Sequence, residues 1–270
     1  MKAIKITKEN AQFQILNALK TNREKRNHEG FIVEGVRNIN NAILYKWNIK
    51  ALFYSSNRKI SSWATNILNT TKTDKHYDLS TDLLAKLSDK EEPSELLALV
   101  EIPKDDLNLI PIHEKLLVVV FDRPSSPGNL GTIIRSCDAL GVDGLIITGH
   151  AVDLYDPETV SATTGSLFGL PIVRLPSQKD LELWINEIKE KVPELQVVGT
   201  DENGTSLYNF DFIKPTILLA GNEKLGLSSG YKEFVGSMVA IPMQGSASSL
   251  NVAVATSIVV SEVQRQRKFK

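Results

Sequence analysis

The chain has 270 residues, of which 42% are hydrophobic and 23% charged, and its formal net charge is −1. These values are typical of a soluble globular protein with one large domain or two of ordinary size. The single cysteine, Cys137, excludes an intramolecular disulfide and a cysteine-based zinc site, and no apolar run approaches the ~18 residues of a membrane span. The N-terminus lacks the apolar segment of a signal peptide, so we expect a cytoplasmic protein with no membrane partner.

The charge is distributed unevenly along the chain. Residues 1–60 carry 12 Lys and Arg against 4 Glu, a balance of +8, whereas residues 74–106 carry 10 acids against 4 bases, a balance of −6. A basic first segment is either a surface that faces phosphate groups or an ordinary solvated, lysine-rich face.

The first hundred residues alternate short helices and strands. Apolar spacing predicts helices over 10–27, 36–44, 60–69 and 81–87, and strands over 31–33, 50–54, 75–78 and 96–100. This alternation is typical of a small α/β domain. The charged, proline-containing segment 102–115 lacks such periodicity, so we divide the chain there into domains 1–106 and 107–270.

The second domain has a different pattern, in which continuous apolar runs predict strands buried on both faces of a central parallel sheet. These runs cover 116–122, 145–148, 172–175, 197–200, 217–221 and 238–241, with helices between most of them. The expected fold is a parallel α/β domain of about six strands. In such sheets ligands bind beyond the carboxyl ends of the strands. That rule selects a first loop (122–131), a second loop (220–228) and a third loop (242–251).

The first loop leads into a helix, and Asn129 is predicted to cap it. Arg135 lies one turn into this helix, off its apolar stripe, and is either a surface charge, a partner for Asp138, or a functional group. Cys137 lies on the stripe, which favours a small buried hydrophobe over a nucleophile. In the second loop, Glu223 follows a buried strand and either caps a helix or orients a substrate.

The third loop consists mainly of small residues, so its backbone can approach a ligand closely. A long helix begins near Leu250, and its free N–H groups suit an oxygen-rich ligand. The dinucleotide and nucleotide-phosphate fingerprints and the hydrolase elbow are absent from the sequence. The four histidines are scattered rather than set at metal-ligand spacing, so no metal site is expected.

Three sequence blocks carry a family resemblance: NLGTIIRSCDALG, LLAGNEKLGLS and VAIPMQGSASSLNVAVA, in that order. They resemble the three motifs of the SpoU/TrmH family of RNA 2′-O-ribose methyltransferases, part of the SPOUT superfamily, over residues 115–265. The upstream segment REKRNHEGFIVEGVRNINNAI is similar to the ribosomal-protein-like substrate-binding domain that is often fused in front.

The resemblance implies a homodimer whose second domain contains a deep trefoil knot, with the chain around 221–265 threaded through a loop. It implies an S-adenosylmethionine site formed by Gly221, Asn222, Ile241, Met243, Ser249 and Leu250. It also implies a catalytic cluster of Asn129, Arg135, Glu223, Ser249 and Asn251, and RNA contacts at Arg23, Lys25, Arg26 and Arg37. Arg135 would fix the phosphate and hydroxyl of the target nucleotide, because a guanidinium rarely gives up its proton, and a second role as the base stays open.

Two positions depart from the family pattern: Lys224 stands where Gly is common, and Ser248 where an acidic residue is frequent. Because neither is a residue of the implied cluster, we expect an active enzyme that acts on structured RNA, with rRNA favoured over tRNA. A non-catalytic RNA-binding or ribosome-assembly protein of the same fold is the alternative. Antibiotic-resistance methyltransferases share this architecture, so that role stays open.

Overall fold

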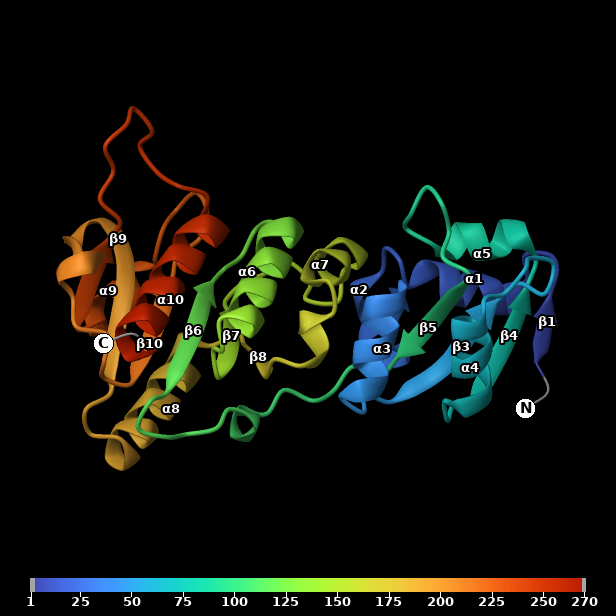
Figure 1. Ribbon diagram of the computed structural model, residues 1–270, viewed down its shortest axis with the longest axis horizontal. Coiled ribbons are helices and arrows are strands. Elements are labelled where there is room, and N and C mark those ends of the chain that lie inside the picture. Colours follow the sequence, from blue (N-terminus) through green and yellow to red (C-terminus); the bar gives the residue numbers. More distant parts are fainter. Residues whose placement is uncertain (1–2, 269–270) are drawn as a thin grey trace. The chain divides into compact units, whose positions relative to one another are not determined.

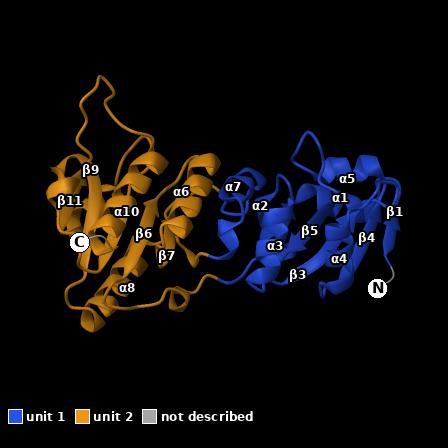
Figure 2. Cartoon of the chain, viewed as in Figure 1, with its two compact units in different colours: residues 1–104, 153–169 blue, residues 105–152, 170–270 orange. Residues whose placement is uncertain are grey.

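The computed structural model describes residues 3–268, which form two compact units (Figures 1 and 2). Unit 1 contains the described residues up to Lys104 together with 153–169, and unit 2 contains 105–152 and the described residues from Leu170 onward. The second unit begins at Asp105, and the predicted boundary lies between residues 106 and 107. Segment 153–169 differs from the prediction, because it belongs with unit 1 although the sequence placed it in the second domain.

Unit 1 is a five-stranded mixed sheet with helices packed against it. The strand order is β1-β4-β3-β5-β2, with β1 (Ile4–Ile6), β2 (Phe31–Glu34), β3 (Ile49–Tyr54), β4 (Lys75–Leu79) and β5 (Leu96–Val100). β3 and β2 pair antiparallel with β5, and the remaining pairs are parallel. The helices are α1 (Ala11–Ala18), α2 (Arg23–Glu29), α3 (Val36–Leu44), α4 (Ser62–Thr70) and α5 (Thr81–Leu87).

The predicted helix over 10–27 is two helices, because the chain contains two N-cap signals. The Asn10 side chain accepts a hydrogen bond from Phe13 N, and the Asn22 side chain accepts one from Lys25 N. An asparagine side chain that satisfies a free N–H group starts a new helix at its own position. The chain therefore turns between α1 and α2.

Segment 153–169 packs into unit 1 through α7 (Pro157–Thr163) and the short 3₁₀ helix η2 (Ser166–Phe168). The rings of Phe31 and Tyr155 lie 4.7 Å apart, and those of Trp47 and Phe168 lie 5.1 Å apart. Trp47 Nε1 also donates to the Phe168 carbonyl at 3.1 Å. Aromatic burial of this kind explains why a segment distant in sequence joins this core.

Unit 2 is a six-stranded, fully parallel sheet of order β11-β9-β10-β6-β7-β8. The strands are β6 (Leu117–Asp122), β7 (Gly144–Thr148), β8 (Ile172–Leu175), β9 (Gln196–Ser206), β10 (Thr216–Ala220) and β11 (Ser237–Ala240). β6, β7 and β10 are buried along their whole length, as their continuous apolar runs predict. The helices are α6 (Pro127–Ala139), α8 (Gln178–Lys191), α9 (Ser229–Phe234) and α10 (Val252–Lys268), with 3₁₀ turns η1 (Leu107–Leu109) and η3 (Leu207–Asn209).

The last helix, α10, crosses back over the sheet. β11 lies at one edge beside β9, and the chain then passes through the exposed third loop and returns as α10 beside α6 (Figure 1). Arg267 fixes the end of α10 by donating to the carbonyls of Lys115, Leu116, Phe212 and Lys214. Over the described residues, no helix is both long and apolar enough to cross a membrane.

Candidate active site

The three selected loops all lie at the carboxyl edge of the unit 2 sheet. The first loop connects β6 to α6, the second connects β10 to α9, and the third connects β11 to α10. Parallel strands bring their carboxyl ends to the same edge, which places these loops together. Side-chain hydrogen bonds then join them directly.

Glu223 of the second loop is held by donors from the first loop. Its carboxylate accepts from Ser125 N at 3.0 Å, Ser125 Oγ at 2.7 Å, Ser126 N at 3.1 Å and Asn129 Nδ2 at 3.2 Å. Partial burial acts to raise the pKa of Glu223, but the hydrogen bonds from Ser125 and Asn129 outweigh it, so the pKa lies below its usual value. The side chain is therefore an ionised acceptor that fastens the second loop to the first.

Asn129 continues the connection to the third loop. Its Oδ1 accepts from Asn251 Nδ2 at 2.9 Å, while Asn251 Oδ1 accepts from Ala253 N at 2.9 Å and caps α10. Asn129 is not the cap of α6 as predicted: Ser126 has that role, and its Oγ accepts from Asn129 N at 3.3 Å. The Asn129 side chain is thereby left to link Glu223 with Asn251.

Arg135 and Cys137 occupy opposite environments on α6. Cys137 is fully buried, which confirms its interpretation as a core residue, and burial raises the pKa of its thiol. Arg135 is exposed, and among residues 3–268 neither Asp138 nor any other carboxylate pairs with it. Its guanidinium thus points to solvent without a salt bridge in the described structure.

The residues predicted to hold S-adenosylmethionine line the second and third loops. Gly221 is buried, and a Cβ there would lie 2.4 Å from the backbone of Gly226 and Leu227, so this turn accepts only glycine. Met243 and Leu250 are 41% and 36% exposed, and Ser249 is exposed beside them. Exposed apolar side chains of this kind are what adenine recognition uses, and the assignment of these residues to the cofactor stays a prediction.

Arg123 is a connection that the sequence analysis did not find. Its guanidinium donates to the buried Asp122 carboxylate at 3.0 and 2.9 Å and to the Gly226 carbonyl at 3.1 Å. The residue has φ of +50°, a left-handed conformation that costs a non-glycine residue roughly 1–2 kcal/mol. Its only sequence signal is a charged pair, Asp122–Arg123, directly after a buried strand.

The predicted RNA-binding residues lie in unit 1, and one of them must be corrected. Arg23 and Lys25 are exposed on α2, and Arg37 is exposed in the first turn of α3. Arg26 is only 3% exposed; its guanidinium lies 2.6 Å from Asp153 and donates to the Leu19 carbonyl at 2.7 Å. This buried ion pair leaves Arg26 unavailable to an RNA phosphate.

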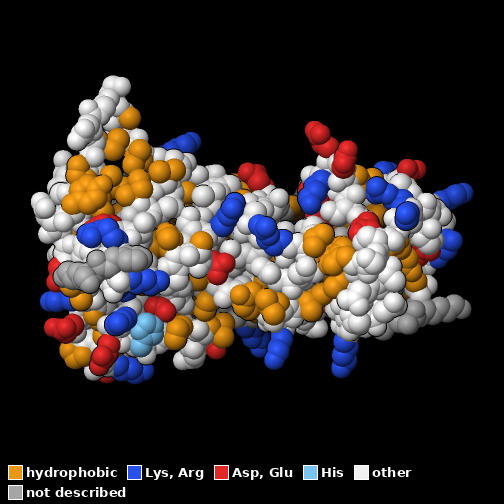
Figure 3. Space-filling view, viewed as in Figure 1, with side chains coloured by type: hydrophobic (Ala, Val, Ile, Leu, Met, Phe, Trp, Pro, Cys, Tyr) orange, Lys and Arg blue, Asp and Glu red, His pale blue; other side chains and the backbone are white. Residues whose placement is uncertain are grey.

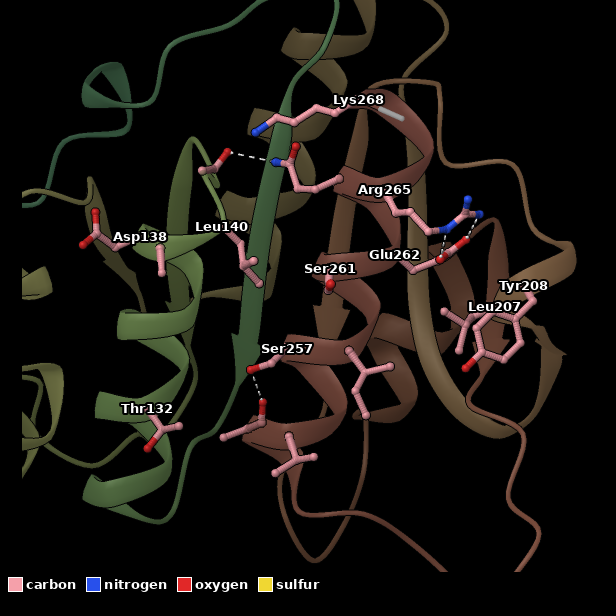
Figure 4. Close-up of a pocket in the computed structure, with 16 residues that line it drawn as sticks. Thr132, Asp138, Leu140, Leu207, Tyr208, Ser257, Ser261, Glu262, Arg265 and Lys268 are labelled. Atoms are coloured by element: carbon pink, nitrogen blue, oxygen red, sulfur yellow. Dashed lines mark hydrogen bonds and ion pairs between the residues drawn. The ribbon is translucent and has the colours of Figure 1, made fainter. Parts of the chain in front are cut away.

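An open groove of about 1040 Å³ runs along α6 and α10 (Figure 4). Leu140, Val254 and Ile258 line it together with Tyr208 of η3, and Ser257 Oγ donates to Ser136 Oγ at 2.8 Å between the helices. Val254 is 48% exposed and Tyr208 is 62% exposed. Figure 3 shows hydrophobic side chains gathered beside α10 on this face of unit 2.

Comparison with known proteins gives the family. The SpoU rRNA Methylase family matches residues 116–261, and the SpoU L30e-like domain matches residues 10–98. The chain belongs to the SpoU methylase family, as the three motifs predicted.

Similar proteins span nearly the whole chain. The 23S rRNA (uridine(2479)-2′-O)-methyltransferase of Streptomyces viridochromogenes is 47% identical over 98% of this chain and 93% of its own. The 23S rRNA (guanosine(2553)-2′-O)-methyltransferase RlmP of Bacillus subtilis is 29% identical over 96% of this chain and 98% of its own. The crystal structure of the SpoU methyltransferase AviRb from S. viridochromogenes with the cofactor AdoMet has a TM-score of 0.91 at 47% identity, covering 96% of this chain and 98% of that one.

Proposed function

We propose that this protein transfers a methyl group from S-adenosylmethionine to a ribose 2′-hydroxyl of 23S rRNA. The observation that carries the proposal is the hydrogen-bonded chain Glu223–Asn129–Asn251, which joins three loops at the carboxyl edge of a parallel sheet. Two relatives that match at least 96% of this chain are 23S rRNA 2′-O-methyltransferases. By contrast, a tRNA-modifying TrmH/SpoU structure from A. aeolicus matches only 59% of it, which favours rRNA over tRNA.

The proposed chemistry is chiefly one of orientation. The bound cofactor supplies an electrophilic methyl group, and the protein must align a ribose hydroxyl with it. Glu223 fixes the amide of Asn129, and Asn129 in turn orients Asn251 at the start of α10. Arg135, exposed and without a carboxylate partner among the described residues, is proposed to bind the phosphate and hydroxyl of the target nucleotide. Ser249 is proposed to complete the site from the third loop.

Unit 1 is proposed to bind the RNA. Its match to the SpoU L30e-like domain and its basic first segment support this assignment. Arg23, Lys25 and Arg37 are the proposed phosphate contacts, because their side chains are exposed, whereas Arg26 is excluded by its buried ion pair. Because the proposed rRNA substrate is assembled in the cytoplasm, we expect the enzyme to act in the cytoplasm as well.

A homodimer is proposed to form through the groove along α6 and α10. Its exposed apolar side chains, Val254 and Tyr208 among them, are the kind of surface that a second copy of the chain would cover. A trefoil knot is also proposed in unit 2. It is supported by the path of the chain, which runs from β11 at the sheet edge back to α10 beside α6.

The first experiment is calorimetric titration of S-adenosylmethionine into the purified protein, with its molar mass measured by light scattering. Micromolar binding to a dimer is expected. Purified 23S rRNA lacking native modification is then incubated with protein and cofactor, and ribose methylation is mapped along it, with 16S rRNA and tRNA as controls. A single methylated 23S ribose is expected. Methylation confined to tRNA, or cofactor binding without methylation of any RNA, would contradict the proposal.

A further inference from the structure

Arg123 ties together two of the three loops, although it is absent from the proposed chemistry. Its guanidinium joins the Asp122 carboxylate to the Gly226 carbonyl, and its own carbonyl accepts from Asn222 Nδ2 at 2.7 Å. The Arg123 backbone N–H donates to the Thr148 carbonyl at the end of β7. One residue therefore connects the ends of β6 and β7 with both ends of a short hairpin in the second loop.

That hairpin is closed at its base by the backbone. Asn222 N donates to the Gly226 carbonyl at 3.0 Å, and Gly226 N donates to the Asn222 carbonyl at 3.0 Å. Asn222 Oδ1 also accepts from Lys224 N and Leu225 N. Glu223, which holds Asn129, lies inside the hairpin, so the position of the hairpin determines whether its carboxylate reaches the first loop.

The backbone around Arg123 is strained in a way that accommodates its side chain. Arg123 has φ of +50°, which a glycine would adopt with less strain. Gly149 has φ of +65°, and a Cβ there would lie 2.6 Å from Arg123 Cγ. Two unusual backbone positions thus accommodate one arginine. Strain of this kind points to a local function.

We propose that Arg123 is a positioning residue that holds the hairpin 222–226 in the conformation that binds S-adenosylmethionine. The inference rests on the proposed function and extends it to a residue outside the proposed cofactor and nucleotide contacts. Asp122, 2% exposed and also bonded to Ser228 N at 2.9 Å, is the fixed anchor. The guanidinium forms two parallel hydrogen bonds with the Asp122 carboxylate and a third with the Gly226 carbonyl. This planar geometry fixes the hairpin relative to Asp122 more rigidly than the single nitrogen of an ammonium would.

The test compares Arg123→Gly, which relieves the left-handed strain and removes the guanidinium, with Arg123→Lys. Lys189→Ala, a change at an exposed cation of α8, is the matched control. Calorimetry measures S-adenosylmethionine affinity without RNA, and hydrogen exchange follows the amides of Asn222 and Gly226 in the free protein. Amides of β10 serve as the internal reference for global unfolding.

Arg123→Gly is expected to weaken cofactor affinity at least tenfold and to speed exchange at both hairpin amides at least tenfold, with β10 unchanged. The cofactor affinity and the amide exchange rates of Arg123→Lys should lie between those of wild type and Arg123→Gly. An ammonium keeps a charge beside the Asp122 carboxylate but cannot form the two parallel hydrogen bonds of the guanidinium. In turnover assays the loss should appear mainly in KM for the cofactor.

Wild-type affinity in Arg123→Gly would overturn the inference, even with faster exchange. Failure of the wild-type protein to bind the cofactor would instead remove the proposed function. In that case the role of Arg123 in holding the hairpin is tested by hydrogen exchange in the free protein alone. Exchange at Asn222 and Gly226 that is the same in Arg123→Gly as in wild type would overturn it.

Discussion

Glu223 receives hydrogen bonds on both carboxylate oxygens, which makes it an organiser of the site rather than a proton acceptor. Oε1 accepts from Ser126 N and Asn129 Nδ2, and Oε2 accepts from Ser125 N and Ser125 Oγ. A carboxylate surrounded by donors keeps its charge, in agreement with the downward direction of its pKa shift. Its contribution should therefore be visible as a dependence of stability on pH.

Glu223→Gln is expected to destabilise the protein by about 2 kcal/mol at neutral pH, because an amide accepts these bonds less strongly than a carboxylate. The folded-state pKa lies below the ordinary 4.5, so this stabilisation is complete above pH 4.5 and is lost as the pH falls through the lowered value. Urea unfolding of both proteins between pH 7 and pH 3 measures the difference. A difference in unfolding free energy that stays constant from pH 7 to pH 3 would contradict an ionised Glu223.

Arg135→Ala is expected to lower methylation at least a hundredfold while leaving S-adenosylmethionine affinity within about twofold. The reason is that Arg135 is exposed on α6 and makes no salt bridge within residues 3–268, so its removal should leave the cofactor loops intact. Single-turnover methylation and calorimetry separate the two quantities. Thr132→Ala, an exposed change one turn earlier on α6, is the control for helix packing. Equal loss of turnover and of cofactor binding would refute the assigned role.

Three residues of the implied catalytic cluster are joined by hydrogen bonds, whereas their catalytic roles stay a prediction. The family resemblance implied that Asn129, Glu223 and Asn251 belong to one cluster, and their side chains form one hydrogen-bonded chain. Their detailed roles could not be read in advance: Ser126 rather than Asn129 caps α6, and Arg26 is buried. Both outcomes depend on side-chain partners far away in sequence or on competition between neighbouring caps, which periodicity does not encode.

At the scale of the elements, the C-terminal part of α10 is held by side-chain hydrogen bonds to distant backbone. The guanidinium of Arg267 is surrounded by backbone carbonyls from the segments that begin β6 and β10, and Gln266 accepts from Phe212 N at 2.9 Å. Burial lowers the pKa of Arg267 from its usual value, although its charge persists at neutral pH because that usual value is far above 7. These contacts hold the end of the helix that supplies Asn251.

Arg267→Met is expected to destabilise unit 2 by roughly 3 kcal/mol, because several carbonyls lose their donor at once. Denaturant unfolding monitored by the fluorescence of Trp184, which lies in α8, measures the change. Arg265→Met provides the comparison, since Arg265 is exposed and pairs with Glu262 on the same helix. Similar denaturant midpoints for wild type and Arg267→Met would contradict the prediction, because they would mean that the carbonyls bond to other donors.

The elements of the unit 2 sheet could be predicted well because buried parallel strands have a simple signature. β6, β7 and β10 follow the predicted apolar runs closely. Prediction was weaker where local signals compete, as at the division between α1 and α2. It was also weaker for β9, which continues to Ser206 and pairs with β11 after a shift in register. That extension pairs Thr205 with Val239 and Ser206 with Ala240, each 34 residues further along the chain, so no local pattern reveals it.

At the scale of the whole molecule, the buried pair Arg26–Asp153 links two distant segments of unit 1. The side chains are 4% and 8% exposed. Arg26→Met is expected to destabilise unit 1 by about 3–5 kcal/mol, because it leaves a carboxylate buried without its cation. Denaturant unfolding followed by Trp47 and Trp63, in a Trp184→Phe background, measures unit 1 separately.

Changing the partner as well provides the control for that prediction. Arg26→Met combined with Asp153→Leu should recover much of the loss, because the double variant buries no unpaired charge. RNA affinity of the double variant should equal that of wild type, since Arg26 is excluded as a phosphate contact. A loss of affinity in a stably folded double variant would restore Arg26 to the RNA surface.

The inclusion of 153–169 in unit 1 has a consequence for protein engineering. The chain passes between the two units three times, near residues 104, 152 and 169, so no single crossover point separates them. A chimera that joins the first hundred residues of one relative to the remainder of another would combine Phe31 and Trp47 from one parent with Tyr155 and Phe168 from the other. Successful exchange of target specificity between relatives therefore requires a two-segment transplant in which 153–169 travels with the N-terminal domain.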